Sequence, residues 1–131
     1  MTQDIAAIAR ATYTAYITKD RKALEALIAD DFCFSSPLDN RLDRTTYFTT
    51  CSPNSDRITG FEIVHLATQG EHVFVTYIGS NRDGHRFRNT EVLTIRDGRV
   101  REVEVYFGWS LPHPAAAGTH VGPANARTEH A

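Results

Sequence analysis

The sequence has few cysteines and no long hydrophobic run. Its two cysteines, Cys33 and Cys51, have neither the spacing of a metal site nor the context of a disulfide-rich domain. No stretch approaches the ~20 apolar residues that a membrane-spanning helix needs. Asp4 and Arg10 interrupt the segment in which a signal peptide would have its apolar core. These absences predict a cytoplasmic protein with reduced thiols and no membrane partner.

A strong positive charge is absent as well, since the formal net charge is −2. Six arginines fall between Arg82 and Arg101, but four acidic residues are interleaved with them. This mixture is typical of a solvated sheet face with cross-strand ion pairs and does not favour nucleic-acid binding. His113, His120 and His130 lie in an irregular tail without compact ligand spacing, so we expect no metal site.

The first half of the chain has helical periodicity. Apolar residues recur at helical spacing over residues 3–18, and Thr2 is a candidate N-cap for this helix. Asp20 can cap a second helix, which continues to about residue 28. Asp43 can cap a third, short helix. The sequence therefore predicts three N-terminal helices.

The second half alternates in the manner of β-strands. Residues 32–36 are β-prone and run into a turn at Pro37, and four more strands follow residue 58 without an intervening helix. Short glycine-containing turns force neighbouring strands to be antiparallel. We expect an α+β fold with one domain over residues 1–111 and an irregular, partly mobile tail over residues 112–131. The four predicted strands are residues 58–67, 71–79, 85–95 and 100–109.

The register of the last hairpin decides which side chains share a face. A two-residue turn at Asp97-Gly98 would place Glu91 beside Glu104. A three-residue loop that begins at Arg96 instead places Glu91 opposite Val103, and we predict this loop. One face of the two strands then carries Phe87, Asn89, Glu91, Leu93, Val103, Val105, Phe107 and Trp109.

Glu91 is the best catalytic candidate on this face. Burial disfavours the charged form of a carboxyl group and raises its pKa, which is how proteins prepare general acids and bases. The alternative is structural: Glu91 accepts hydrogen bonds from Asn89, a tyrosine or an arginine and has no catalytic role. The sequence leaves both interpretations open.

Four segments carry a family resemblance: residues 13–20, 27–37, 87–98 and 103–109. In order and spacing they resemble the nuclear transport factor 2-like superfamily, in particular its SnoaL-like and ketosteroid-isomerase-like members. The resemblance implies a cone-shaped fold, in which helices close one side of a strongly bent, mostly antiparallel sheet around a cavity. It also implies a homodimer through the outer sheet face, where Val92 and Tyr106 lie.

The resemblance extends to individual residues. Tyr13 falls where steroid isomerases keep the tyrosine of their oxyanion hole, and Glu91 falls where they keep its partner acid. The base should precede Pro37, but Ser36 stands there, and a hydroxyl cannot take a proton from carbon unaided. Asp39 is the candidate substitute. Classical steroid isomerisation is therefore not expected.

Two functions are consistent with these residues. The first is a cofactor-independent isomerase, dehydratase or cyclase that acts by proton transfer on a small apolar oxygenated molecule, with Glu91, Tyr13 and Asp39 as catalytic candidates. The second is a non-catalytic module that binds a ligand or a protein. The candidate substrate-binding residues are Tyr16, Phe34, Ser36, Tyr47, Phe87, Asn89, Val103, Phe107 and Trp109.

Overall fold

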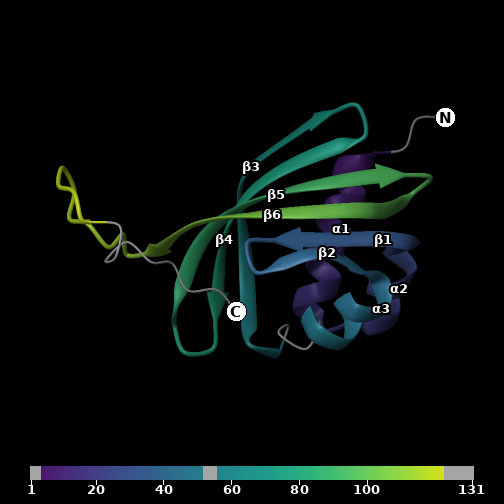
Figure 1. Cartoon of the computed structure of the whole chain (residues 1–131), viewed down its shortest axis with the longest axis horizontal. Helices are drawn as coiled ribbons and strands as arrows, with labels where there is room; N and C mark the ends of the chain where they lie inside the picture. Colours follow the sequence, from purple (N-terminus) through teal and green to yellow (C-terminus); the bar gives the residue numbers. More distant parts are fainter. Residues whose placement is uncertain (1–3, 52–55, 123–131) are drawn as a thin grey trace.

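Three N-terminal helices pack on one sheet in the computed structural model, which describes residues 4–51 and 56–122. The helices are α1 (Ile5–Thr18), α2 (Arg21–Leu27) and α3 (Arg44–Thr46), and α3 continues into a π-helical turn, η1 (Tyr47–Cys51). Figure 1 shows all three helices beside the strands. No helix in the described part of the chain is long and apolar enough to cross a membrane.

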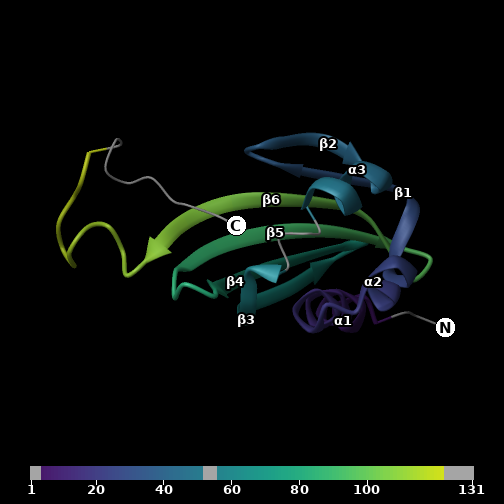
Figure 2. The ribbon, with the colours of Figure 1, turned by 90° about the horizontal axis from the view of Figure 1, so that it is seen from below.

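The sheet has six strands in the order β2-β1-β6-β5-β4-β3. Neighbours are antiparallel except for β1 and β6, which are parallel. Figure 2 shows α1 and α2 on the opposite side of the long strands from β2 and α3. The α+β prediction is thus confirmed, whereas the cone shape stays a prediction. The strands are β1 (Ile28–Ser36), β2 (Asp39–Asp43), β3 (Ile58–Gln69), β4 (His72–Asn81), β5 (Arg86–Arg96) and β6 (Arg99–Leu111).

Aspartates cap the three helices. Asp20 accepts a hydrogen bond from the Ala23 amide (3.0 Å), and Asp43 accepts one from the Thr46 amide (2.8 Å), as predicted. The cap of α1 is Asp4, which fixes the start of this helix two residues later than predicted. Thr2, the predicted cap, lies outside the described residues.

Strands β1 and β2 form a hairpin that the sequence did not reveal. The turn after Pro37 leads directly into β2, and Ser36 pairs with Asp39. The other edge of β1 pairs with β6 in parallel and sets Phe34 beside Val103. Ile28, expected in the second helix, instead begins β1. These pairings bring the β1–β2 turn to the same cavity as β5 and β6.

The predicted three-residue loop between β5 and β6 is wrong. Asp97 and Gly98 both have positive φ (55° and 79°) and form a two-residue turn closed by Arg96 and Arg99. A bulge in β6 then moves the register, and Glu91 lies opposite Val105 instead of Val103. Because the two registers differ by two residues along β6, the side chains keep the predicted face.

A second bulge corrects the placement of Trp109. Asn89 pairs with Phe107, but Phe87 pairs with Ser110, so β6 has an extra residue there. A Cβ at Gly108 would collide with the carbonyl oxygen of Arg88, so the bulge requires glycine. Trp109 is turned off the inner face, is 42% exposed, and lies beside the Arg88 guanidinium and the His113 ring. The prediction that Trp109 lines the pocket is wrong.

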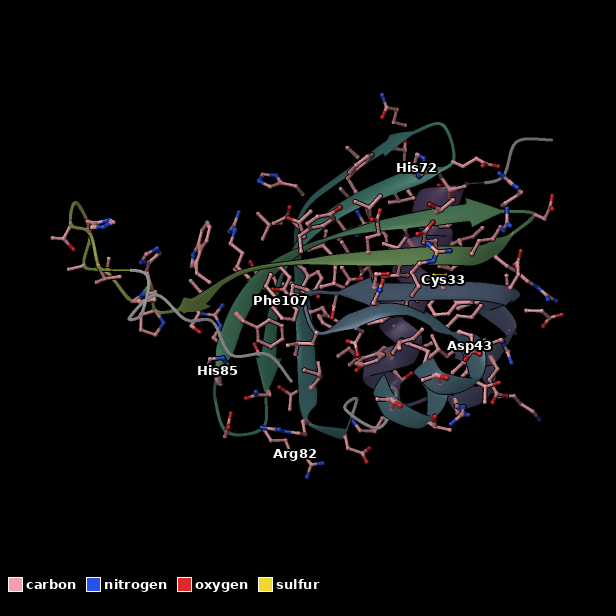
Figure 3. All side chains as sticks on the ribbon, viewed as in Figure 1. Cys33, Asp43, His72, Arg82, His85 and Phe107 are labelled. Atoms are coloured by element: carbon pink, nitrogen blue, oxygen red, sulfur yellow. The ribbon has the colours of Figure 1, made fainter. Side chains whose placement is uncertain are left out.

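The outer arginines are partly paired with carboxylates, as predicted. Arg96 donates to Glu71 at 2.9 Å, and Arg101 donates to Asp31 at 2.7 Å. Arg82 lies at the β4–β5 turn, away from Asp43 at the start of α3 (Figure 3).

The described part of the tail, residues 112–122, has no helix or strand and leads away from the sheet in Figure 1.

Candidate functional site

A cavity of about 420 Å³ lies between α1, the inner face of the sheet and η1. Its deep walls are apolar, and the exposed lining residues Leu38, Thr50 and Arg57 mark its mouth. Eleven of the twelve predicted site residues line it, which is every one except Trp109. They are Tyr13, Tyr16, Phe34, Ser36, Asp39, Tyr47, Phe87, Asn89, Glu91, Val103 and Phe107.

The Glu91 carboxyl group accepts a hydrogen bond at each oxygen. Tyr13 of α1 donates its hydroxyl hydrogen to Oε1 over 3.0 Å, and Tyr77 of β4 donates to Oε2 over 2.6 Å. Protein groups enclose the carboxyl group, and the intermediate exposure of Glu91 reflects its contact with the cavity. Glu91 therefore faces a largely apolar interior with two phenolic donors fixed on it.

Burial raises the pKa of Glu91 above its usual value, because the charged form loses hydration. The hydrogen bonds from Tyr77 and Tyr13 oppose this effect by stabilising the carboxylate. The pKa values of Tyr13 and Tyr77 lie well above their usual range, first through burial and next through the nearby negative charge of Glu91. The phenols thus keep their hydrogens, and Glu91 is the group that titrates.

Asn89 extends this network along β5. Its Nδ2 donates to the Tyr77 hydroxyl oxygen over 3.3 Å, and its Oδ1 accepts from the Gly108 amide over 3.3 Å. The bulge at Gly108 supplies that amide. Asn89 is 4% exposed, so the chain from Gly108 to Glu91 forms a buried polar line inside the apolar cavity.

Ser36 and Asp39 form a separate polar pair on the cavity wall. The Ser36 hydroxyl donates to Oδ2 of Asp39 over 2.8 Å and accepts from the Leu38 amide over 3.0 Å. Asp39 comes close to the expected base position but uses one carboxylate oxygen to hold Ser36. The site therefore contains two carboxylates, and burial raises the pKa of Glu91.

Aromatic rings hold the two tyrosines in place. Phe61 of β3 contacts both Tyr13 and Tyr77, with ring centroids 5.3 and 4.9 Å apart. On the other side of the cavity, Tyr47 contacts Phe34 with the ring centroids 5.1 Å apart. Packed rings restrict the rotamers of their neighbours, so the phenolic oxygens are positioned before any ligand enters.

A protein-family model matches most of the chain. The model for the SnoaL-like domain matches residues 9–103. The chain belongs to the SnoaL-like family. No curated protein matches this SnoaL-like chain.

Solved structures show the same fold at low sequence identity. A nuclear transport factor 2-like protein of unknown function from Burkholderia xenovorans LB400 has TM-score 0.71 and 22% identity, covering 90% of this chain and 95% of its own. A proposed ketosteroid isomerase from Kribbella flavida DSM 17836 has TM-score 0.70 and 17% identity, and the match covers 94% of this chain and 93% of the isomerase. An LEH-like epoxide hydrolase from M. tuberculosis has TM-score 0.67 and 19% identity, and the match covers 77% of this chain and 80% of the hydrolase. The fold thus occurs among proteins with different activities.

Sequence reasoning missed several residues of the SnoaL-like cavity, among them Tyr77, Phe61 and Arg57. The alternation of Val73, Val75 and Tyr77 along β4 was the signal that could have placed Tyr77 on the inner face. Arg57 precedes β3 and has no such pattern. Within residues 4–51 and 56–122, no group of three or more histidine, cysteine, aspartate or glutamate side chains could hold a metal ion.

Proposed function

We propose that this SnoaL-like protein catalyses a proton transfer, without a cofactor, on a small apolar molecule that carries an oxygen. Isomerisation, dehydration and aldol-type cyclisation are reactions of this kind. The observation that supports the proposal is the Glu91 carboxyl group, which is enclosed in an apolar cavity and has a pKa raised by burial. Such a group exchanges protons closer to neutral pH than an exposed glutamate does.

Glu91 acts as the base in this proposal. The carboxylate takes a proton from a carbon next to a carbonyl group. The electron pair of that C–H bond forms a C=C bond, and the π pair of the carbonyl group moves onto its oxygen. Protonated Glu91 then donates its own O–H to the Tyr13 oxygen, which frees the Tyr13 hydrogen for the new oxyanion. Return of the proton to a different carbon completes an isomerisation.

The apolar walls bind the body of the substrate. Tyr16, Phe34, Tyr47, Phe87, Val103 and Phe107 line the cavity around the polar network. Their rings and methyl groups favour an apolar skeleton. Ser36 and Asp39 would contact a second oxygen of the substrate on the cavity wall.

Deuterium exchange tests the proposal without knowledge of the product. A panel of cyclic ketones and enones is incubated with the protein in D₂O, and mass spectrometry follows deuterium incorporation at carbon. We expect incorporation by the wild type and a loss of at least ~100-fold in E91Q, since general base catalysis contributes about that much or more. E62Q is the matched control, because Glu62 is exposed on β3.

Asp39 is the competing base, and D39N separates the two. A large loss in D39N with little loss in E91Q would assign the base to Asp39 and remove Glu91 from that role. A similar loss in both variants would indicate an acid and a base that act together.

The second candidate function is a non-catalytic binding module. Ser36 in place of the expected base favours it, because Asp39 has a hydrogen-bonding role with this serine. A ketone that raises the melting temperature of the wild type, yet gains no more deuterium than it does in buffer, would support binding over catalysis.

We also propose a homodimer through the outer sheet face. Phe74 of β4 is 37% exposed and Tyr106 of β6 is 55% exposed, and Val92 lies opposite Phe74 on the next strand. Apolar side chains grouped on a sheet face favour association. Sedimentation equilibrium should give twice the chain mass, and a mass of one chain would contradict the proposal.

A further inference from the structure

Asn89 has a hydrogen that no described residue accepts. A backbone amide can only donate, so the Gly108 N–H fixes Oδ1 as the Asn89 atom that faces it. Nδ2 must then point the other way and carries two hydrogens, of which Tyr77 accepts one. Asn89 is 4% exposed and lines the cavity. The second N–H is therefore a buried donor in a fixed orientation.

The hydroxyl groups of Tyr13 and Tyr77 cannot replace this donor while Glu91 is ionised. Tyr13 and Tyr77 have one hydroxyl hydrogen each, and both hydrogens go to Glu91. The network then offers a ligand one N–H, on Asn89, and several acceptors. A buried donor without a partner costs free energy, and a ligand oxygen can remove that cost.

We propose that Asn89 binds a neutral carbonyl oxygen and so selects carbonyl compounds. This inference rests on the proposed function, in which Glu91 takes a proton from the carbon next to that carbonyl group. Asn89 and Glu91 are two residues apart on one face of β5, which separates their Cα atoms by about 7 Å. One small molecule can contact both side chains. Tyr77 is a positioning residue, because it holds Glu91 and Asn89 together.

Two probes of the same skeleton test the selection. 1-Indanone has a carbonyl group and hydrogen on the adjacent carbon, and indane lacks the oxygen. Dissociation constants for both are measured by NMR titration of the full chain. We expect the wild type to bind 1-indanone roughly 3- to 10-fold more tightly than indane, which is the effect of one neutral hydrogen bond.

Variants assign this preference to Asn89. N89L removes the amide and should bind both probes equally. N89A also removes the amide and leaves no side-chain donor, so it should lose the preference as well, and it provides a second test if N89L folds poorly. F34L is the matched control: it should weaken both probes alike and leave their ratio unchanged, because Phe34 lines the cavity without belonging to the polar network.

The binding test of Asn89 and the deuterium-exchange test of Glu91 can have different outcomes. E91Q should lose deuterium exchange but keep a preference for 1-indanone, so the inference stands or falls on the binding ratio alone. A wild-type ratio near one, a preference retained in both Asn89 variants, or no binding of either probe would overturn the inference.

Discussion

Tyr77 is hydrogen bonded to Glu91 over 2.6 Å across the β4–β5 pair, although the residue directly opposite Glu91 is Val75. The contact is diagonal, because Tyr77 lies opposite Asn89 and reaches one position along the face. Tyr77 consequently touches both the proposed base and the proposed carbonyl donor. Its hydroxyl group donates to Glu91 and accepts from Asn89.

The Y77F variant should raise the pKa of Glu91 further. The Tyr77 hydroxyl stabilises the carboxylate and lowers its pKa more than Tyr13 does, while burial raises it. Without this donor, the midpoint at which Glu91 ionises should move to higher pH, and Y13F should cause a smaller movement in the same direction. The pH profile of deuterium exchange measures the midpoint.

Y106F is the control for loss of a tyrosine hydroxyl, because Tyr106 is exposed on the outer face. Its profile should match that of the wild type. A midpoint that falls in Y77F would show that Tyr77 favours the protonated carboxyl group and does not stabilise the negative charge of Glu91.

Replacement of Glu91 by glutamine should change how stability depends on pH. Because the folded-state pKa of Glu91 is raised, the folded protein keeps a proton that the unfolded chain loses above about pH 4.3. The wild type therefore loses stability at this site as the pH rises from there through the folded-state pKa. E91Q has no such loss, since glutamine does not titrate.

Urea denaturation of both proteins at several pH values measures this effect. The difference in unfolding free energy should move in favour of E91Q as the pH rises, by about 1.4 kcal/mol for each unit by which the pKa is raised. Other titrating groups are common to both proteins and cancel. A difference that moves in favour of the wild type would mean that the tyrosines outweigh burial.

Local patterns predicted most of the elements. The helical spacing before residue 18, the aspartates at positions 20 and 43, and the alternation after residue 58 each depend on neighbours in sequence, and the structure agrees with them. The parallel contact between β1 and β6 joins residues that are about seventy positions apart. No local pattern encodes such a contact. The edge strand β2 was missed for another reason: Asp39, Asn40 and Asp43 are residue types that are depleted in strands.

The face around Glu91 was predicted correctly from the wrong turn. Side chains along a strand alternate between the two faces of the sheet, so an error of two residues in register left Glu91 and Asn89 in the cavity. Trp109 lies beyond a second bulge, and the one extra residue there moves its side chain to the other face. Bulges depend on backbone contacts such as Gly108 with Arg88, which a single sequence does not reveal.

The position of Trp109 makes a spectroscopic prediction. Trp109 is the one tryptophan of the chain, is 42% exposed and does not line the cavity. Binding of 1-indanone should leave its emission unchanged, and W109F should bind the probe with the wild-type dissociation constant. A saturable change in emission at the probe concentrations that fill the cavity would place the ring against the ligand and contradict the bulge.

Gly79 determines the space available to Phe87. The two residues are paired across β4 and β5, and a Cβ at Gly79 would lie 2.5 Å from the Phe87 ring. The ring is 3% exposed and lines the cavity, so it must move in G79A. We expect a loss of about 1–3 kcal/mol in unfolding free energy, typical of an overpacked core. G60A is the matched control: no atom lies within 4 Å of the added methyl group, so its stability should not fall.

A double mutant separates a clash with the ring from a general effect of alanine in β4. F87L alone should destabilise the protein, because it leaves a cavity in the core. If the Phe87 ring is what the new methyl group meets, F87L should relieve the clash, and G79A/F87L should lose less stability than the sum of the two single losses. Additive losses would mean that the backbone of β4, and not the ring, limits the space at Gly79.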